Sequence, residues 1–221
     1  MFAADLSTSR GRAKAWSHSL LADHAVFRVL WHNFAVVAPG RLYRSNHPTP
    51  AQLAAAARRH GIRTVINLRG HRPCGSDALS RDAAARLGLA HIDMALESRG
   101  APHRERILRL AEIFRMMTPP ALIHCKSGAD RAGLAAGLFI LLGGGTAQDA
   151  LAQLSWRFGH MSKSRTGILD SFFLHYAATG ERHGKNFLEW VREDYDEMAL
   201  RRNFRAGGFA GFVNDRILRR E

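Results

Sequence analysis

Residues 121–142 read ALIHCKSGADRAGLAAGLFILL, and this stretch decides the fold of the chain. It opens with a short apolar run after the Pro119-Pro120 break and closes with an apolar helical pattern over residues 131–142. A polar loop that contains Gly128 lies between them. A buried strand that passes through such a loop into a helix is typical of a parallel sheet covered by helices.

The segments before and after this stretch continue the alternation of strands and helices. Residues 62–68 (IRTVINL) are apolar and β-branched, which is typical of a strand buried on both faces. Thr49 and Pro50 form an N-cap and first turn for a helix that Gly61 ends. Further strands are predicted at residues 41–44, 89–94 and 121–124, and further helices at residues 77–87, 102–117, 146–156, 167–178 and 186–200. The predicted fold class is α/β, with a central, mainly parallel sheet flanked by helices and a helical C-terminal part.

Both ends of the chain extend beyond this predicted core. Residues 1–14 are polar, and we expect no regular structure there. Apolar residues at near-helical spacing from Trp16 to Phe34 predict an amphipathic helix, which either packs on the domain or lies on an acidic membrane surface. The predicted organisation is therefore an N-terminal extension at residues 1–35, a central domain at residues 36–180 and a helical C-terminal extension at residues 181–221.

The chain is strongly basic. Its 221 residues include 32 Lys and Arg against 19 Asp and Glu, so the formal net charge is +13, and most of the excess lies in the first half. Such a charge attracts phosphorylated molecules, acidic lipids or nucleic acids, or it simply makes a solvated basic surface. A nucleic-acid partner is not expected, because the sequence has no recognisable binding motif or interleaved aromatic residues.

The cysteines and the apolar runs indicate where the protein resides. Cys74 and Cys125 form neither a disulfide framework nor a pair with metal-ligand spacing. The N-terminus lacks the apolar stretch of a signal peptide. The longest apolar run, residues 134–142, is shorter than the ~20 residues that span a bilayer. We expect a soluble protein in a reducing compartment, most simply the cytoplasm, with no metal and no cofactor.

The loop at residues 124–133 carries the chemistry. It leads into a helix N-terminus, where backbone N–H groups and the helix dipole attract an anion. Gly128 allows the amides to approach phosphate oxygens, and Arg131 can hold two of those oxygens with its planar fork. The same groups would stabilise the thiolate of Cys125, its nucleophilic form. The alternative is that Cys125 is a small buried side chain in an ordinary turn.

The segment HCKSGADRAG resembles the His-Cys-(any five)-Arg signature of protein-tyrosine and dual-specificity phosphatases. The upstream stretch RLYRSNHPTPAQLAAAARRHGIRTVINLRG is similar to the entry region of bacterial and atypical dual-specificity members, so the resemblance covers about residues 36–160. It implies a phosphocysteine intermediate at Cys125 and no metal, and we expect His124 to orient the loop from behind by a hydrogen bond rather than to act as a base. It also implies that the loop's amides bind the substrate phosphate, at Lys126, Ser127, Gly128, Ala129 and the residues up to Arg131.

One position departs from the pattern of the family. Its members usually carry Ser or Thr directly after the Arg, where the hydroxyl helps the thiolate to leave, but this chain has Ala132. Either the second chemical step is slower, or another group such as Ser127 or a water molecule replaces the hydroxyl. The departure also admits a phosphate-binding module of low activity.

The leaving group needs a proton, commonly from a carboxylic acid. Asp130 is our first candidate, because some similar bacterial phosphatases carry an Asp at this place in the loop. Glu97 and Asp93 are the second and third candidates, from the stretch that corresponds to the mobile acid loop of many relatives. Asp130 has a structural alternative as a first-turn carboxylate that stabilises the helix dipole.

The substrate is left open between a phosphorylated protein, a phosphoinositide and an inositol polyphosphate. Lys126 resembles the basic residue that some lipid phosphatases place directly after the Cys. Arg69, Arg72 and Arg99 are predicted at the carboxyl ends of strands, where they either recognise substrate charge or are simply solvated. Cys74 is predicted on the same side of the sheet as Cys125, as an unreactive thiol or as a partner that captures oxidised Cys125 in a disulfide.

Overall fold

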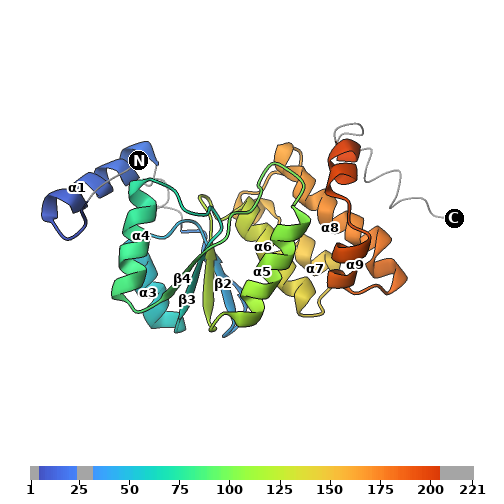
Figure 1. Ribbon diagram of the computed structural model, residues 1–221, viewed down its shortest axis with the longest axis horizontal. Coiled ribbons are helices and arrows are strands. Elements are labelled where there is room, and N and C mark those ends of the chain that lie inside the picture. Colours follow the sequence, from blue (N-terminus) through green and yellow to red (C-terminus); the bar gives the residue numbers. More distant parts are fainter. Residues whose placement is uncertain (1–4, 24–31, 205–221) are drawn as a thin grey trace. The chain divides into compact units, whose positions relative to one another are not determined.

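Five strands form a single mixed sheet in the computed structural model, in the order β1-β2-β5-β3-β4 (Figure 1). Strands β2, β5, β3 and β4 run parallel, and β1 pairs antiparallel with β2. The bounds are β1 Ala35–Ala38, β2 Leu42–Ser45, β3 Thr64–Asn67, β4 Ala90–Asp93 and β5 Ala121–His124. The predicted α/β class with a mainly parallel sheet is confirmed, and β1 is a strand that the sequence analysis missed.

The four parallel strands end level with one another. Their pairing places Ser45 opposite His124, His124 opposite Asn67, and Asn67 opposite Asp93. Cys125 therefore follows the central strand at the carboxyl edge of the sheet, with strands on both sides. This is the edge at which open parallel sheets bind ligands.

The structure describes residues 5–23 and 32–204, which fall into two compact units. The first unit comprises residues up to 95 together with residues 117–128, and it contains the whole sheet. The second unit comprises residues 96–116 and those from 129 onward, and it is helical. The boundary falls between Gly128 and Ala129, inside the loop that the sequence analysis identified.

Two helices of the first unit, α3 (Pro50–His60) and α4 (Gly75–Arg86), lie together along one side of the sheet (Figure 1). The Thr49 hydroxyl accepts from the Gln52 amide and the Gln52 side chain accepts from the Thr49 amide, so helix α3 begins with the predicted cap. Gly61 ends it with φ +64°, a conformation that glycine adopts without strain. The helices and the sheet enclose a core of Tyr43, Leu53, Ala56, Ile62, Val65, Ala83, Ala84 and Leu122.

The N-terminal prediction is confirmed for residues 16–22, which are helical, and was wrong for residues 9–14 and 32–34. Helix α1 (Ser9–Ser17) begins before the predicted helix and inside the segment for which we expected no regular structure. It starts there because the Thr8 hydroxyl accepts from the Gly11 amide. One π-helical turn, η1 (His18–Ala22), follows and ends at Asp23. Residues 24–31 of the predicted helix lie outside the described residues.

Each predicted helix of the second unit has a counterpart in the structure, but two of them differ from the prediction in length. Helices α5 (Arg104–Met116), α6 (Asp130–Leu142) and α8 (Ile168–Thr179) lie close to their predicted bounds. The predicted helix at 146–156 is only α7 (Ala147–Leu151). The one predicted at 186–200 is interrupted, since α9 (Phe187–Glu193) ends before Tyr195 and a second helical stretch covers residues 197–204. Short 3-10 turns fill the connections: η2 (Trp156–Phe158), η3 (Arg165–Gly167) and η4 (Glu181–His183).

The core of the second unit requires a glycine and a group of aromatic residues. A Cβ at Gly137 in α6 would lie 2.4 Å from the ring of Phe173 and 2.8 Å from the carbonyl oxygen of Ala150, so only glycine allows α7 and α8 to approach this closely. The aromatic core consists of Phe172, Phe173, Tyr176, Phe187, Trp190 and Tyr195.

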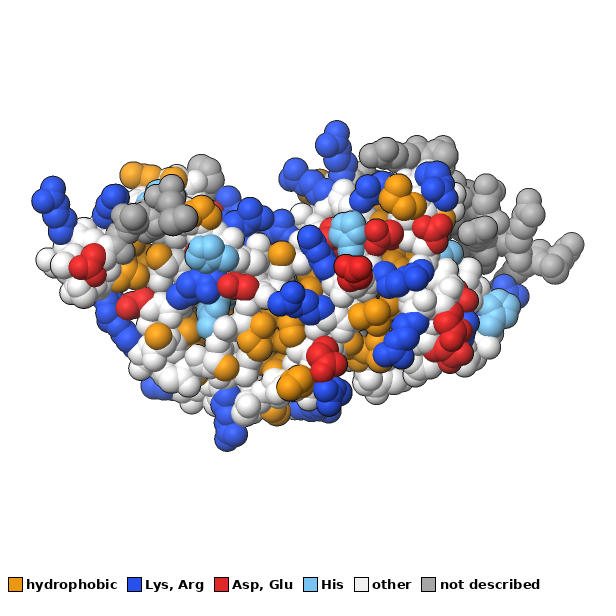
Figure 2. All heavy atoms as spheres, in the orientation of Figure 1, with side chains coloured by type: hydrophobic (Ala, Val, Ile, Leu, Met, Phe, Trp, Pro, Cys, Tyr) orange, Lys and Arg blue, Asp and Glu red, His pale blue; other side chains and the backbone are white. Residues whose placement is uncertain are grey.

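The basic side chains are distributed over the visible face of the molecule. Figure 2 shows Lys and Arg side chains scattered over the visible face, interspersed with acidic ones, and not gathered in one patch. Among the described residues, no helix is both apolar enough and long enough to cross a bilayer.

Candidate active site

The sulfur of Cys125 lies at the base of the loop in the first unit. The side chain is buried, and its Sγ accepts a hydrogen bond from the amide of Gly128 at 3.3 Å. An N–H that points at the sulfur stabilises a thiolate more than a thiol. The loop therefore turns back over the cysteine as a phosphate-binding loop must.

Gly128 makes this turn possible. Its φ is +77°, and a Cβ on it would lie 2.7 Å from the amide nitrogen of Asn46 and 2.8 Å from the carbonyl carbon of Ser45. Both the backbone conformation and the packing thus exclude a side chain. The loop packs against the backbone at the end of β2, and this contact fixes its position at the edge of the sheet.

Two side chains hold the loop through its carbonyl groups. Arg44, at the centre of β2, is completely buried and donates from Nη2 to the carbonyl oxygen of Gly128 at 2.8 Å. Asn33 donates from Nδ2 to the carbonyl oxygen of Ser127 at 2.8 Å. These bonds hold two carbonyl groups of the loop, while the Gly128 amide points at the sulfur.

Burial lowers the pKa of Arg44 to about 10, and the nearby charge of Cys125 partly offsets this effect. The guanidinium stays protonated near neutral pH because even this lowered pKa is well above 7. A buried cation in the first unit therefore attracts the Cys125 thiolate.

Lys126 and Ser127 are exposed on the outer side of the loop. Lys126 Nζ lies 3.6 Å from Oδ1 of Asp23, and Arg69 binds both oxygens of the same carboxylate at 3.1 Å. Arg69, which the sequence analysis left between a recognition role and a solvated one, is thus held in a partly buried ion pair. The anion that holds these two cations comes from the residue after η1.

His124 and His47 support the loop from behind. His124 is completely buried, and its ring packs edge-on against that of His47 at a centroid distance of 4.6 Å. The His47 amide donates to the carbonyl oxygen of Lys126, and its ring bonds the carbonyl oxygen of Ser76 in α4. These contacts connect the loop to the neighbouring helix.

In the second unit, Arg131 is fixed on the first turn of α6. Its Nε donates to the carbonyl oxygen of Leu96 at 3.0 Å, and its Nη2 donates to Oγ of Ser98 at 3.2 Å. A guanidinium has five N–H groups in one plane, so the remaining ones are left for an anion.

Asp130 begins α6 and belongs to a buried polar chain. Its Oδ1 lies 2.8 Å from Nδ1 of His160, whose Nε2 lies 2.6 Å from Oδ2 of Asp170. Ser162 donates to the other oxygen of Asp170 at 2.8 Å. A ring with a carboxylate at each nitrogen donates from both, so His160 is an imidazolium between two acids.

Burial alone would lower the pKa of His160, but the hydrogen bonds that it donates to Asp130 and Asp170, with the charges of these carboxylates, outweigh burial and raise the pKa to about 9. The side chain of His160 is completely shielded from solvent, whereas that of Asp130 is 24% exposed. A donor that is charged near neutral pH thus contacts a partly exposed carboxylate.

The two other candidate acids are occupied by arginines. Asp93 forms hydrogen bonds with Arg81 through both oxygens, at 2.7 and 2.6 Å, in the first unit. In the second unit, Glu97 contacts Arg106 at 2.5 Å and His103 at 3.5 Å. Both carboxylates therefore have structural partners.

The structure thus brings together His124, Cys125, Lys126, Ser127 and Gly128 in one unit, and Ala129, Asp130, Arg131 and Glu97 in the other. Ala132 is completely buried in α6. Sequence reasoning missed Arg44, Asp23 and His160. Arg44 lies in a strand that the sequence predicted, and an arginine at the centre of a buried strand was the available signal.

Comparison with known proteins identifies the family. A family model described as a Swiss Army Knife protein, DSP-PTPase phosphatase domain (PTP-SAK), matches residues 31–207. The chain belongs to this family. It is therefore a phosphatase of the dual-specificity and tyrosine phosphatase type, and the resemblance on which the sequence analysis relied is confirmed.

Solved structures of phosphatases share the fold. TpbA of P. aeruginosa is 22% identical, with 66% of this chain and 91% of that chain covered and a TM-score of 0.51. The core catalytic domain of the PP-IP phosphatase SIW14 of S. cerevisiae is 18% identical, with 80% and 93% covered and a TM-score of 0.52. No curated protein sequence matches this phosphatase at a significant level.

Substituting Gly128 tests the loop of this phosphatase. Gly128→Ala should remove most of the turnover and most of the affinity for phosphate analogues, because the methyl group collides with backbone atoms at 2.7 and 2.8 Å. Gly144→Ala is a matched control, since Gly144 has φ +83° but nothing within 4 Å of its Cβ position. It should lose about 1–3 kcal/mol of stability from backbone strain alone and keep its activity. Steady-state kinetics and circular dichroism of the two variants would show the difference, and equal activities would contradict the loop geometry.

The charge of His160 should make stability depend on pH. Because its pKa is raised from 6.5 to about 9, its charged contacts stabilise the folded state fully below pH 6.5, and this contribution is lost as the pH rises through 9. The shift corresponds to a contribution of the order of 3 kcal/mol.

Urea unfolding of wild type and of His160→Gln measures this contribution. The advantage of the wild type in free energy of unfolding should shrink between pH 6 and pH 10. His183→Gln, at an exposed histidine, should show no such trend. A constant difference for His160→Gln across this range would mean that His160 is not held as an imidazolium.

Proposed function

We propose that this phosphatase hydrolyses phosphomonoesters through a phosphocysteine at Cys125, with Arg131 holding the phosphoryl group and Asp130 transferring the proton. The observation that carries the proposal is the hydrogen bond from the Gly128 amide to the sulfur of Cys125. A loop closed in this way binds the charge of the transition state with its amides and stabilises the nucleophile at once. The backbone groups that would hold the phosphate are those of Lys126, Ser127, Gly128 and Ala129.

In the first step, the Cys125 thiolate attacks phosphorus, the S–P bond forms and the P–O bond to the leaving group breaks. The leaving oxygen takes a proton from Asp130. In the second step, a water molecule attacks phosphorus and transfers its proton to the Asp130 carboxylate, while the S–P bond breaks and the thiolate leaves. No redox partner is required, and inorganic phosphate is the product.

The pairing of the carboxylates supports Asp130 as the acid. Asp93 and Glu97 are committed to arginines, whereas Oδ2 of Asp130 has no hydrogen-bond partner among the described residues. Nδ1 of His160 holds Oδ1 of Asp130 at 2.8 Å and leaves Oδ2 for the leaving oxygen. His160 is therefore a positioning residue for Asp130.

Ala132 leaves the second step without the hydroxyl that the family usually places there. Since the methyl group of Ala132 is completely buried, a replacement by serine must fit into a packed helix face. Ser127 or a water molecule is the remaining group that can assist the departing thiolate.

There are two candidate substrate classes. A phosphorylated protein, with phosphotyrosine as the reacting group, fits the family, and TpbA has been crystallised in complex with pTyr. A phosphorylated inositol or its lipid is the second candidate, favoured by the cation of Lys126 directly after the nucleophile and by the fold shared with a PP-IP phosphatase. A noncatalytic phosphate-binding module is the alternative of another class, and turnover of para-nitrophenyl phosphate that orthovanadate inhibits would exclude it.

Replacing the nucleophile and its partner tests the mechanism. Cys125→Ser should abolish turnover and keep measurable binding of phosphate analogues, because a hydroxyl stays protonated where a thiol ionises. Arg131→Lys should also lose turnover, since an ammonium cannot make the planar two-point contact. Cys74→Ser is the control: Cys74 caps α4 without a side-chain hydrogen bond, so serine is tolerated there. Full activity in Cys125→Ser would rule out the assigned nucleophile.

The general acid is tested with substrates of different leaving groups. Asp130→Asn should lower turnover of phenyl phosphate by about 10²–10⁴-fold and affect para-nitrophenyl phosphate much less, because a good leaving group needs no proton. One limb of its pH–rate profile should flatten. Glu97→Gln serves as the comparison, and if it shows this pattern while Asp130→Asn does not, the acid is Glu97.

A further inference from the structure

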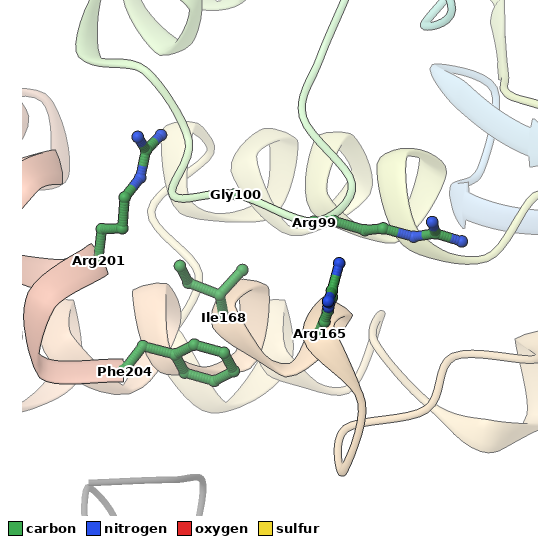
Figure 3. Close-up of a pocket in the computed structure, with 6 residues that line it drawn as sticks. All are labelled: Arg99, Gly100, Arg165, Ile168, Arg201 and Phe204. Carbon is green, nitrogen blue, oxygen red and sulfur yellow. The ribbon is translucent and has the colours of Figure 1, made fainter. Parts of the chain in front are cut away.

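The second unit contains a cleft with arginines at its rim. Its volume is about 380 Å³, at the lower end of the range for small-molecule sites. In Figure 3, the Arg165 side chain points toward Arg99, and Arg201 lies on the other side of Gly100. The residues that line the cleft are Arg99, Gly100, Arg165, Ile168, Arg201 and Phe204.

Within residues 5–23 and 32–204, no acidic side chain compensates the charge of this cleft. None of the described residues that line it is acidic, and among the described residues none of the three arginines forms an ion pair with a carboxylate. The nearest acid along the loop, Glu97, is held by Arg106 and His103. An anion between the guanidinium groups would therefore lower their mutual repulsion.

The two walls of the cleft are fixed to each other by hydrogen bonds. Tyr195 donates from its hydroxyl to the carbonyl oxygen of Pro102 at 2.7 Å, and Arg104 donates to the carbonyl oxygen of Tyr195. Glu197 accepts from the Arg104 amide at 3.1 Å and contacts His103 at 2.9 Å. The loop with Arg99 is thus tied to the helical stretch at 197–204, so the cleft is a preformed feature of this unit.

The same loop reaches the arginine of the proposed active site. Arg131 bonds Leu96 and Ser98, and Arg99 is the next residue along the chain. A molecule whose reacting phosphate is held by Arg131 therefore has the cleft beside it within the same unit. The floor is apolar, with the side chains of Ile168 and Phe204 between the arginines (Figure 3).

We propose that this cleft binds further phosphate groups of a small polyphosphorylated substrate, with a phosphorylated inositol ring as the best-fitting chemistry. Arginine forks bind phosphate in two-point contacts, and the apolar floor packs against the carbon ring. A substrate with a single phosphate uses Arg131 and leaves the cleft empty. The proposal rests on the proposed function, whose substrate class it specifies.

The test compares selectivity between substrates. The double variant Arg165→Gln with Arg201→Gln spares Arg99, which is adjacent to the contacts of Arg131. The measured quantity is kcat/KM for an inositol polyphosphate divided by kcat/KM for para-nitrophenyl phosphate. We expect this ratio to fall by about tenfold to a hundredfold, as expected for lost charge-assisted hydrogen bonds. The ratio is measured in parallel for soluble inositol hexakisphosphate and for a phosphoinositide in phosphatidylcholine vesicles. A larger fall in the ratio for the soluble compound identifies a free inositol phosphate as the ligand, and a larger fall for the vesicles identifies a lipid headgroup.

Arg182→Gln is the matched control, because it removes the same charge from an exposed position of the same unit outside the cleft. It should leave the ratio at the wild-type value. An unchanged ratio in the double variant would overturn the proposal. An equal fall for a tyrosine-phosphorylated acidic peptide would also overturn it and would assign the cleft to peptides.

A binding measurement separates this proposal from the proposed function. Calorimetry with inositol hexakisphosphate should show weaker binding, by at least about tenfold, in the double variant than in wild type or Arg182→Gln. If no variant hydrolyses para-nitrophenyl phosphate but this difference in binding is found, the phosphatase mechanism fails and the anion site stands. If para-nitrophenyl phosphate is hydrolysed but all three proteins bind inositol hexakisphosphate equally, the phosphatase mechanism stands and the anion site is refuted.

Discussion

The contact between the Gly128 amide and the sulfur of Cys125 is the constraint on which the rest of the first unit depends. It requires a left-handed backbone conformation at Gly128 and a close approach to the chain that leaves β2. The loop can be held in this conformation because its outward carbonyls are bonded by Arg44 and Asn33. Burying the Arg44 guanidinium costs free energy, and the cost is offset by the hydrogen bond and by the attraction to a thiolate.

The charged side chains near the loop form ion pairs, and these pairs limit the chemical roles of the side chains. Asp23 holds Arg69 and Arg81 holds Asp93, so these groups serve the architecture of the first unit, whereas Lys126 lies 3.6 Å from Asp23 and stays largely exposed. In the second unit, the partner of Asp130 is itself a cation placed between two acids, and only one of the oxygens of Asp130 is used. The two aspartates are thus held differently, because Nη2 of Arg81 contacts both oxygens of Asp93, whereas the imidazole of His160 contacts one oxygen of Asp130.

The sequence predicted elements best where their signals are local. The strand Ala121–His124 and the start of α3 at Pro50 agree with the structure, since a short apolar run and a capping box act within a few neighbouring residues. The N-terminal helix was placed too late, because the cap at Thr8 was overlooked beside the apolar spacing further on. Strand β1 was missed because it is short and depends on pairing with β2 for its conformation.

The sequence by itself determined the α/β class, the family and the candidate residues Cys125, Gly128 and Arg131, because a phosphate-binding loop is a contiguous motif whose glycine and spacing reflect backbone geometry. Only the tertiary structure decided which charges lie near one another within each unit. Arg44, His160 and the arginines at 99, 165 and 201 lie far apart along the chain, and no local pattern records which of them share a neighbourhood. Partners for ionised groups are set by packing, since a carboxylate becomes a structural anchor or a proton carrier according to which side chain the fold places beside it.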